Sequence, residues 1–459
     1  MYNLILVPSL FCPANCKYCF GPKHNIESPS GGCENKPMDV GTIEYALDFA
    51  LRLSVEKGLP LQSDDASGGC VRVIFHGGEP LSAGISFFKE TLPRIIEKVS
   101  RQHLSKVLPS DKDKKTTPLA IEAAHSAVEF SIQSNLWLLT EDMCKLFAEY
   151  RVSLGVSIDG PEEITDAQRG RGYFQKTMDA IDMARRHGIS VSCLCTFTRY
   201  SAAHSDEVYD FFVQNSLDFS FHQAVPSLNE REEDLWSLCP EEYGELLISL
   251  LERYIQQETK TFIGQPQGVA PTRHTQQPPK IKIDTLDSLC QGVAAGKGGI
   301  CTFTDCLGDF LAIAPDGGIY PCQRFIDSTL GKENNGFCLG NVRNCQDIHS
   351  LKAHPFWQYL RQRQDAVNNK VLLPEGCSSC TYLSFCRGGC AYNALASGNK
   401  SSKDPYCLAY KRIYGHIIER AMSEVFSEEN LTCVVKEGGG LIKKGRLLEI
   451  MKGRSQDTE

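Results

Sequence analysis

The sequence has no long apolar run, and this absence is the first limit on what the protein does. A membrane-crossing helix needs about 20 consecutive apolar residues, and no segment of the 459 residues approaches that length. Residues 1–5 contain no basic segment and no cleavage-like site of the kind that precedes secretion. We therefore expect a cytoplasmic protein that does not enter a membrane.

A long basic run is also missing. The net charge is −8, with 48 Lys and Arg residues against 56 Asp and Glu residues. Chains that bind nucleic acid concentrate positive charge on one face, so nucleic acid is not a favoured partner. The hydrophobic content of 42% and the charged content of 23% are those of an ordinary globular protein. The length favours about two or three domains.

Cysteine, in contrast, is abundant, with 21 residues. In a long chain without a secretory signal, dense cysteine indicates metal or redox sites rather than a disulfide scaffold. Three cysteines lie between residues 12 and 19, and eight form a second group between residues 301 and 407. The others are interpreted as small buried hydrophobic residues. These are Cys33, Cys70, Cys144, Cys193, Cys195, Cys239, Cys290, Cys338, Cys345 and Cys433.

The first cysteine group has the spacing CxxxCxxC and consists of Cys12, Cys16 and Cys19. It follows a short apolar run at residues 4–8, so it is interpreted as a loop that leaves a buried strand. Three thiolates suit a 4Fe–4S cluster in which one iron has no protein ligand. An open iron is a site for chemistry. The spacing alone also permits a zinc site, because zinc accepts cysteine ligands.

Strand-like and helix-like segments alternate over the first half of the chain. Such alternation predicts right-handed βαβ units and a parallel sheet, here an incomplete version of the eight-stranded barrel, a partial (β/α)6 TIM-like barrel. Strands are expected at 4–8, 71–75, 128–135, 152–160, 189–198 and 217–225, and helices at 41–56, 86–108, 140–150, 173–187 and 204–215.

Polar signatures follow the expected strands at the points where they end. Functional groups of such folds gather at the carboxyl ends of the strands, so this coincidence favours a functional role for each signature. Capping and turn formation is the alternative role for the last two residues. The signatures are Gly77, Gly78 and Glu79, then Gln133, Ser134 and Asn135, and then Ser157 and Asp159.

The CxxxCxxC loop followed by a strand that ends in Gly-Gly-Glu-Pro resembles the radical S-adenosylmethionine (SAM) enzymes. The resemblance implies that the amine and carboxylate of SAM occupy the open iron of the cluster. One electron then cleaves the sulfonium, and the 5′-deoxyadenosyl radical abstracts hydrogen from a substrate. The protein supplies orientation and exclusion of water.

The resemblance also implies roles for individual residues. Cys12, Cys16 and Cys19 match the cluster ligands, and Tyr18 matches the aromatic residue that packs near adenine. Residues 166–169 resemble the DxxR segment of these enzymes, in which the arginine commonly holds the carboxylate of SAM. For Arg169 and for Arg171, a surface salt bridge is an equal alternative. The other expected SAM contacts are Gly77, Gly78 and Glu79 at the amine, Ser134 and Asn135 at the next strand end, Ser157 and Asp159 at the ribose, and Arg169 or Arg171 at the carboxylate.

The second cysteine group resembles the SPASM domain, which binds two auxiliary 4Fe–4S clusters. Gly317 marks a hairpin turn that is expected to bring Cys306 and Cys322 together. Four ligands for each cluster leave no open iron, which suits electron transfer; a pair of structural zinc sites is the alternative. By resemblance, the first auxiliary cluster takes Cys301, Cys306, Cys322 and Cys390, and the second takes Cys377, Cys380, Cys386 and Cys407.

These features divide the chain into four expected regions. The radical SAM partial barrel covers residues 1–225, and a helical bridge with a flexible insert at 264–279 covers 226–295. The SPASM domain covers 296–410, and a closing helix with a tail covers 411–459.

SPASM enzymes mostly act on peptides or proteins, so the resemblance implies a maturase of a ribosomal peptide that forms a crosslink or changes a side chain. Sulfatase maturation to formylglycine is a weaker alternative. Such maturases have an Asp base directly after the second auxiliary-cluster cysteine, whereas Cys322 is followed by Gln323 and Arg324. A non-catalytic iron–sulfur electron-transfer protein is the alternative from another class, although such a carrier needs no cofactor pocket.

The expected partners are a peptide or protein substrate and an electron donor such as ferredoxin or flavodoxin. Many peptide maturases carry an N-terminal domain that binds the leader of the peptide. Here the first expected strand begins by Leu4, so we expect no such domain before it. The leader is then bound by a separate leader-binding protein, by the bridge at 226–295, or not at all.

Overall fold

The structure of the chain is a computed structural model. The expected flexible insert at 264–279 and the tail beyond residue 425 lie outside the residues that it describes. The described residues are 2–20, 37–56, 71–107, 128–228, 236–263, 280–326, 336–344, 348–370, 373–374, 376–398 and 403–425.

The central feature is one sheet in which the first six strands are parallel and follow each other in chain order. This confirms the expected partial barrel of βαβ units. The six strands are β1 Tyr2–Leu6, β2 Val71–Phe75, β3 Val128–Ser134, β4 Ser153–Ser157, β5 Val191–Phe197 and β6 Phe219–Gln223.

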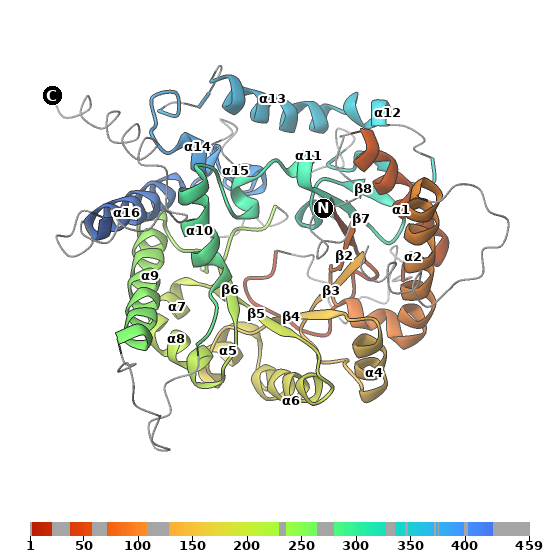
Figure 1. The fold of residues 1–459 in the computed structure, drawn as a ribbon, viewed down its shortest axis with the longest axis horizontal. Coiled ribbons are helices and arrows are strands. Elements are labelled where there is room, and N and C mark those ends of the chain that lie inside the picture. The colour runs from red at the N-terminus through yellow and green to blue at the C-terminus, as the bar shows by residue number, and fades with distance from the viewer. Residues whose placement is uncertain are drawn as a thin grey trace.

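Helices cover the outside of this curved sheet, as Figure 1 shows. Along the inner strands, buried residues alternate with partly accessible ones. In β3 this alternation holds at every position. The buried face packs against the helices, where Phe75, Phe88 and Phe147 form edge-to-face pairs with centroids 5.4 and 5.2 Å apart. The other face is left to line the interior of the barrel.

The helices around the barrel follow the expected spacing closely. They are α1 Val40–Glu56, α2 Gly84–Val107, α4 Glu141–Glu149, α5 Glu162–Arg169, α6 Tyr173–Arg186, α7 Arg199–Ala202 and α8 Ser205–Gln214, with the short 3-10 helix η1 Pro80–Ala83 after β2. Helix α5 was not expected from the sequence. It is acidic in its first turn and carries Arg169 in its last turn, which suits the dipole of a helix.

The cysteine-rich region continues the barrel sheet directly. Strand β7 (Phe310–Ile313) pairs in parallel with β1, and β8 (Gly318–Tyr320) and β9 (Gly340–Asn341) follow in antiparallel pairing. Gly317 stands in the turn between β7 and β8 with a φ of +89°, so the expected hairpin is present. One sheet therefore fixes the position of the second cysteine group relative to the first.

The remaining helices close the molecule at the upper and left side of Figure 1. Helices α9 and α16 pack side by side, and Glu252 of α9 pairs with His416 and Arg420 of α16. No helix among the described residues is long and apolar enough to cross a membrane. The elements are α9 Pro240–Ile263, α10 Asp284–Ala295, η2 Cys301–Phe303, α11 Cys306–Asp309, η3 Gln323–Phe325, α12 Ile348–Lys352, α13 Pro355–Asn369, α14 Leu383–Cys386, α15 Ala391–Ala396 and α16 Cys407–Val425.

Candidate active site

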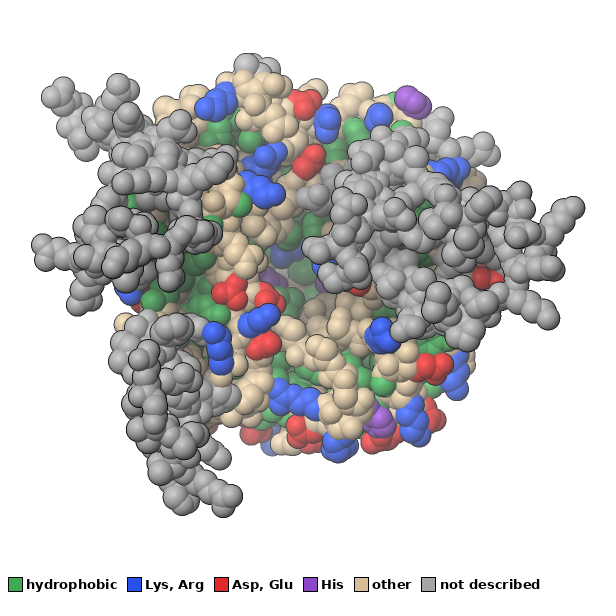
Figure 2. Space-filling view, in the orientation of Figure 1, with side chains coloured by type: hydrophobic (Ala, Val, Ile, Leu, Met, Phe, Trp, Pro, Cys, Tyr) green, Lys and Arg blue, Asp and Glu red, His purple; other side chains and the backbone are tan. Residues whose placement is uncertain are grey.

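A cavity of about 420 Å³ lies at the carboxyl ends of the barrel strands, where side chains from both halves of the chain meet. Its volume is within the usual range for a small-molecule site. Figure 2 shows that this face of the molecule is hollowed near its centre. Seven cysteines line the cavity, three from the first group and four from the second: Cys12, Cys16, Cys19, Cys301, Cys306, Cys322 and Cys390.

The cysteine loop is held in place by the Gly-Gly-Glu segment after β2. The backbone N–H of Gly78 donates to the carbonyl of Ser9 at 3.1 Å, and that of Glu79 donates to the carbonyl of Phe11 at 2.7 Å. A Cβ on Gly78 would lie 2.3 Å from the carbonyl oxygen of Leu10. The glycine is therefore required by the close approach of the cysteine loop itself, which places Cys12 beside the strand end.

Replacing Gly78 with alanine is expected to displace this loop, because the clash is with backbone and no side chain can move aside. We expect the variant to lose most of its SAM-dependent product while it still folds. The measurement is 5′-deoxyadenosine formed per chain, next to circular dichroism of the same sample. Gly84→Ala is the matched control, since nothing lies within 4 Å of a Cβ there, although its φ of +79° costs some stability. Equal amounts of 5′-deoxyadenosine from the wild type and from Gly78→Ala would contradict the role of Gly78 in positioning the cysteine loop.

Glu79 is the buried centre of the strand ends. Its carboxylate accepts hydrogen bonds from the Ser134 hydroxyl at 2.7 Å and from the Asn135 backbone at 2.9 Å. Burial raises the pKa of Glu79, and these hydrogen bonds oppose the rise. The Asn135 side chain then reaches the Cys12 sulfur at 3.6 Å. The predicted residues at three strand ends are thus joined into one network.

Asp159 is fully buried and belongs to the densest polar network of the barrel. It binds Arg169 through both carboxylate oxygens, with Arg169 Nε donating at 2.8 Å and Nη2 donating at 2.7 Å. It also accepts from the Tyr18 hydroxyl at 2.8 Å, from the Gln168 side chain at 2.7 Å and from the Thr196 backbone at 2.9 Å. The Arg169 salt bridge is therefore an interior pair and not a surface one.

The structure separates the predicted SAM contacts into two groups. Arg169 lines the cavity and its Nη1 lies 4.0 Å from the Cys16 sulfur, whereas Arg171 is exposed and does not line it. Ser157 lines the cavity, and Asp159 stands behind it without contributing to the wall. The other predicted contacts on the cavity wall are Tyr18, Gly77, Gly78, Glu79, Ser134 and Asn135.

The first three cysteines act on one another electrostatically, as the ligands of one group would. Burial raises the pKa of the Cys16 thiol to about 12, and the charges of Cys19 and Cys12 add to the rise. Burial also raises the pKa of the Cys12 thiol to about 11. Crowded, free thiols of this kind become thiolates when a cationic cluster binds, with release of protons. The donor set therefore fits a cluster.

The cysteines of the second group act on one another electrostatically, and the strongest effects lie within each of the two proposed sets. Burial, followed by the charges of Cys390, Cys322 and Cys301, raises the pKa of Cys306. Burial, followed by the charges of Cys380, Cys407 and Cys377, raises the pKa of Cys386 to about 12. Only the first set reaches the cavity.

Asp404 connects these two sets. Its buried carboxylate accepts from the backbone N–H of Cys390 at 2.7 Å and from the Asn393 side chain at 3.1 Å. Its backbone carbonyl accepts from the N–H of Cys407 at 3.2 Å. One residue thereby positions a cysteine of each set.

Replacing Asp404 with alanine is expected to remove iron from the first auxiliary set, because the Cys390 backbone donor loses its partner inside the protein. The second set should keep its iron, since the carbonyl that accepts from Cys407 belongs to the backbone and is unchanged. Up to about four of about twelve iron atoms should be lost, while the SAM-binding cluster stays. Iron analysis and the electron paramagnetic resonance signal of the SAM-bound cluster would measure the two parts separately. Asp404→Asn, which keeps the shape and one acceptor, should retain more iron. Full iron content in Asp404→Ala would contradict this positioning role.

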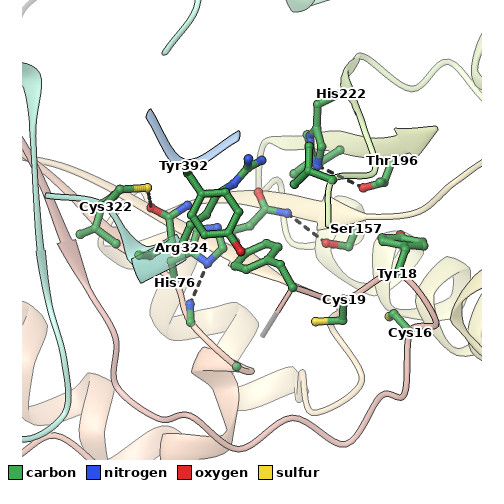
Figure 3. A pocket seen from close by; sticks show the side chains of 18 of the residues that line it. Cys16, Tyr18, Cys19, His76, Ser157, Thr196, His222, Cys322, Arg324 and Tyr392 are labelled. Carbon is green, nitrogen blue, oxygen red and sulfur yellow. Dashed lines mark hydrogen bonds between the residues drawn. The ribbon is translucent and has the colours of Figure 1, made fainter. Parts of the chain in front are cut away.

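Several cavity residues were not predicted from the sequence. Burial, with a further effect of the Arg324 charge, lowers the pKa of His76 to about 4 and that of His222 to about 3, so both rings are neutral. Figure 3 shows His76, Arg324 and Tyr392 on one side of the cavity and Thr196 with His222 on another. His222 contacts the Thr196 hydroxyl at 3.3 Å. The alternation of buried residues in β6 places His222 on the cavity face, a signal that the sequence contained.

Comparison with known proteins agrees with this geometry. Residues 6–211 match the model of the radical SAM superfamily. An uncharacterized protein of Methanothermobacter thermautotrophicus is 35% identical over 255 residues, which cover 56% of this chain and 80% of that protein. The chain belongs to the radical SAM superfamily. A cysteine-type anaerobic sulfatase-maturating enzyme of Clostridium perfringens is 24% identical over 92% of this radical SAM chain and 97% of its own length.

Two solved structures share the fold. Native anSMEcpe with bound AdoMet superposes with a TM-score of 0.66 at 22% identity, over 92% of this chain and 98% of that one. Streptococcus suis SuiB bound to the precursor peptide SuiA gives a TM-score of 0.50 at 16% identity, over 89% of this chain and 75% of that one. These matches confirm the predicted barrel with a SPASM domain. Membership of the superfamily confirms an enzyme that uses SAM and an iron–sulfur cluster.

Proposed function

We propose that this radical SAM enzyme removes a hydrogen atom from a peptide or protein substrate and so modifies a side chain of a ribosomal peptide. The observation that carries the proposal is the shared cavity. Cys12, Cys16 and Cys19 line one side of it, and the first auxiliary cysteine set lines the other. Support comes from the fold neighbour solved with a precursor peptide, SuiB with SuiA, and from the full-length similarity to sulfatase-maturating enzymes.

Within this proposal, Cys12, Cys16 and Cys19 hold the first cluster, and the strand ends around Glu79 hold SAM. When bound, these cofactors supply a carbon-centred radical that removes hydrogen from the substrate. The chain itself orients and shields this step. Glu79 offers its buried carboxylate to the SAM amine. Arg169 is the residue proposed for the SAM carboxylate, and its Nη1, which lies beside Cys16 and donates to the Tyr173 hydroxyl at 3.3 Å, would exchange that partner for the carboxylate.

The remaining assignments belong to the same proposal. Cys301, Cys306, Cys322 and Cys390 hold the first auxiliary cluster, next to the cavity, and Cys377, Cys380, Cys386 and Cys407 hold the second, away from it. This order suits a relay of electrons between the cavity and an external donor such as ferredoxin or flavodoxin. Residues 1–225 and 296–410 are the proposed domains, with the bridge at 226–295 between them. The proposal further places the enzyme in the cytoplasm. It also includes a separate protein that binds the leader of the peptide substrate.

The test is anaerobic reconstitution of the full chain, followed by reduction with SAM present. The expected result is about twelve iron atoms per chain together with formation of 5′-deoxyadenosine. About four iron atoms, with zinc in the other positions, would overturn the auxiliary-cluster assignment. Iron without 5′-deoxyadenosine would favour the electron-transfer protein instead.

A second candidate is formylglycine formation in a sulfatase, which the similarity to sulfatase-maturating enzymes favours. The residue after Cys322 argues against it. Gln323 has its amide oxygen 3.2 Å from the Cys322 sulfur, and an amide cannot accept a proton as a carboxylate base does. Incubation with a short sulfatase peptide that contains the Cys or Ser to be oxidised distinguishes the two, since aldehyde formation by the wild type would favour this candidate.

A further inference from the structure

One part of the cavity wall is rich in hydrogen-bond donors that the described residues of the protein leave largely without acceptors. It is formed by Arg324, His76 and Tyr392, which come from η3, from the end of β2 and from α15. Figure 3 shows the three side chains beside one another, on the same side as Cys322. The barrel contributes His76, and the cysteine-rich region contributes Arg324 and Tyr392, each two residues after a cysteine of the first auxiliary set.

Arg324 presents a cation to the cavity. Its guanidinium lies against two rings that contact each other, 5.4 Å from the Phe20 centroid and 5.6 Å from the Tyr392 centroid. Its one hydrogen bond to a side chain of the described residues is a long one, 3.5 Å from Nη1 to the Asn393 amide oxygen. The negative charges acting on it come from cysteine and tyrosine side chains, with no carboxylate among the main ones. Among the described residues, most of its five donors have no hydrogen-bond partner and can bind a ligand.

The other two side chains add donors that point to the same class of ligand. The Nδ1 atom of His76 accepts from the Gly77 backbone at 2.7 Å, so the neutral ring carries its proton on Nε2. The Tyr392 hydroxyl oxygen accepts from the Leu228 backbone at 3.4 Å, which leaves its own proton to be donated. A guanidinium, an imidazole N–H and a phenol O–H together match the acceptors of a carboxylate.

We propose that Arg324, His76 and Tyr392 bind a carboxylate of the peptide substrate, either an Asp or Glu side chain or the C-terminal group. The inference rests on the proposed function and narrows its substrate to acidic or C-terminal peptide segments. A guanidinium binds a carboxylate through two parallel hydrogen bonds, so the subsite fixes orientation as well as charge. The reacting residue of the peptide is thereby held beside the SAM site, in the same cavity.

Two other roles compete for Arg324. It could bind the carboxylate of SAM, which has the same chemistry, or it could only balance the charge of the thiolates Cys322 and Cys390. The test therefore uses the reconstituted full-length enzyme with saturating SAM. Isothermal titration compares three small probes with their neutral isosteres: the N-acetyl α-amides of aspartate and asparagine, those of glutamate and glutamine, and N-acetylglycine with its amide.

We expect at least one acidic probe to bind about tenfold or more tightly than its amide, because a buried cation left without its anion rejects the neutral form. Arg324→Met should abolish this preference, Arg324→Lys should keep part of it, and the dissociation constant of SAM should stay unchanged in both. Failure of the proposed function is recognised separately, by absence of 5′-deoxyadenosine from the same wild-type sample.

Three outcomes overturn the inference. The first is equal binding of acid and amide in all three pairs, or a preference that persists in Arg324→Met. The second is competition between the acidic probe and SAM together with weaker SAM binding in Arg324→Met, which would assign the subsite to SAM. The third is a shifted reduction potential of an auxiliary cluster in Arg324→Met with the acid preference intact, which would leave charge balance as its role.

Discussion

Replacing Cys16 with alanine is expected to abolish formation of 5′-deoxyadenosine. Two cysteines cannot hold a cluster that needs three protein ligands, so the SAM-binding cluster should be lost and the auxiliary clusters kept. Iron should fall by about four of about twelve atoms per chain. Product is measured by chromatography after anaerobic reduction, and iron is measured on the same sample.

The matched control is Cys239→Ala. Cys239 is a half-buried cysteine outside the cavity, next to Glu242 at the start of α9. It should keep wild-type iron and product. Product from Cys16→Ala at the wild-type level would mean that the CxxxCxxC loop does not bind the cluster. Loss in both variants would point to general unfolding, which circular dichroism would reveal.

Replacing Asp159 with alanine is expected to destabilise the fold by about 3–5 kcal/mol, the usual cost of leaving one member of a buried pair uncompensated. The side chain of Asp159 is 0% exposed and that of Arg169 is 7% exposed, so water cannot replace the lost carboxylate. The donors of Tyr18, Gln168 and the Thr196 backbone lose their acceptor as well. Denaturant unfolding monitored by circular dichroism gives the change in free energy.

The comparison for this prediction is Glu44→Gln, which breaks the surface pair of Glu44 with Arg94. These side chains are 45% and 49% exposed, so the loss should stay below about 1 kcal/mol. A similarly small loss for Asp159→Ala would show that the network around Arg169 does not support the barrel. Asp159→Asn keeps one of the two acceptor oxygens and removes the charge, so it should recover only a small part of the lost stability; full recovery would show that the charge contributes nothing.

Much of the fold followed from the sequence because two periodicities alternate along it. The apolar runs at residues 71–75 and 128–135 and the helical spacing at 41–56 each bury one face, and the structure has these elements at nearly the same bounds. The polar residues at strand ends could be placed together because parallel strands end on one side of a sheet. Gly317 could be placed in a turn because few other residues adopt its conformation.

Long-range contacts could not be predicted in this way. The parallel pairing of β7 with β1 joins residues some 300 positions apart, and no local pattern encodes it. The engagement of Asp159 by Arg169 depends on helix α5, whose eight residues are too few for a clear periodicity. Arg324 and Tyr392 each stand two residues after a cysteine. The cysteine spacing could be recognised in the sequence, but no local pattern shows that Arg324 and Tyr392 share a cavity with His76.

The most direct test of the account is the origin of the hydrogen atom that 5′-deoxyadenosine gains. Cells that naturally contain this protein are grown in deuterated medium, and their peptide and protein fraction is separated from their small metabolites. Each fraction is incubated with the reduced enzyme and unlabelled SAM, and the mass of the 5′-deoxyadenosine is measured. The account predicts deuterium from the peptide and protein fraction. Deuterium from the small metabolites alone would contradict it.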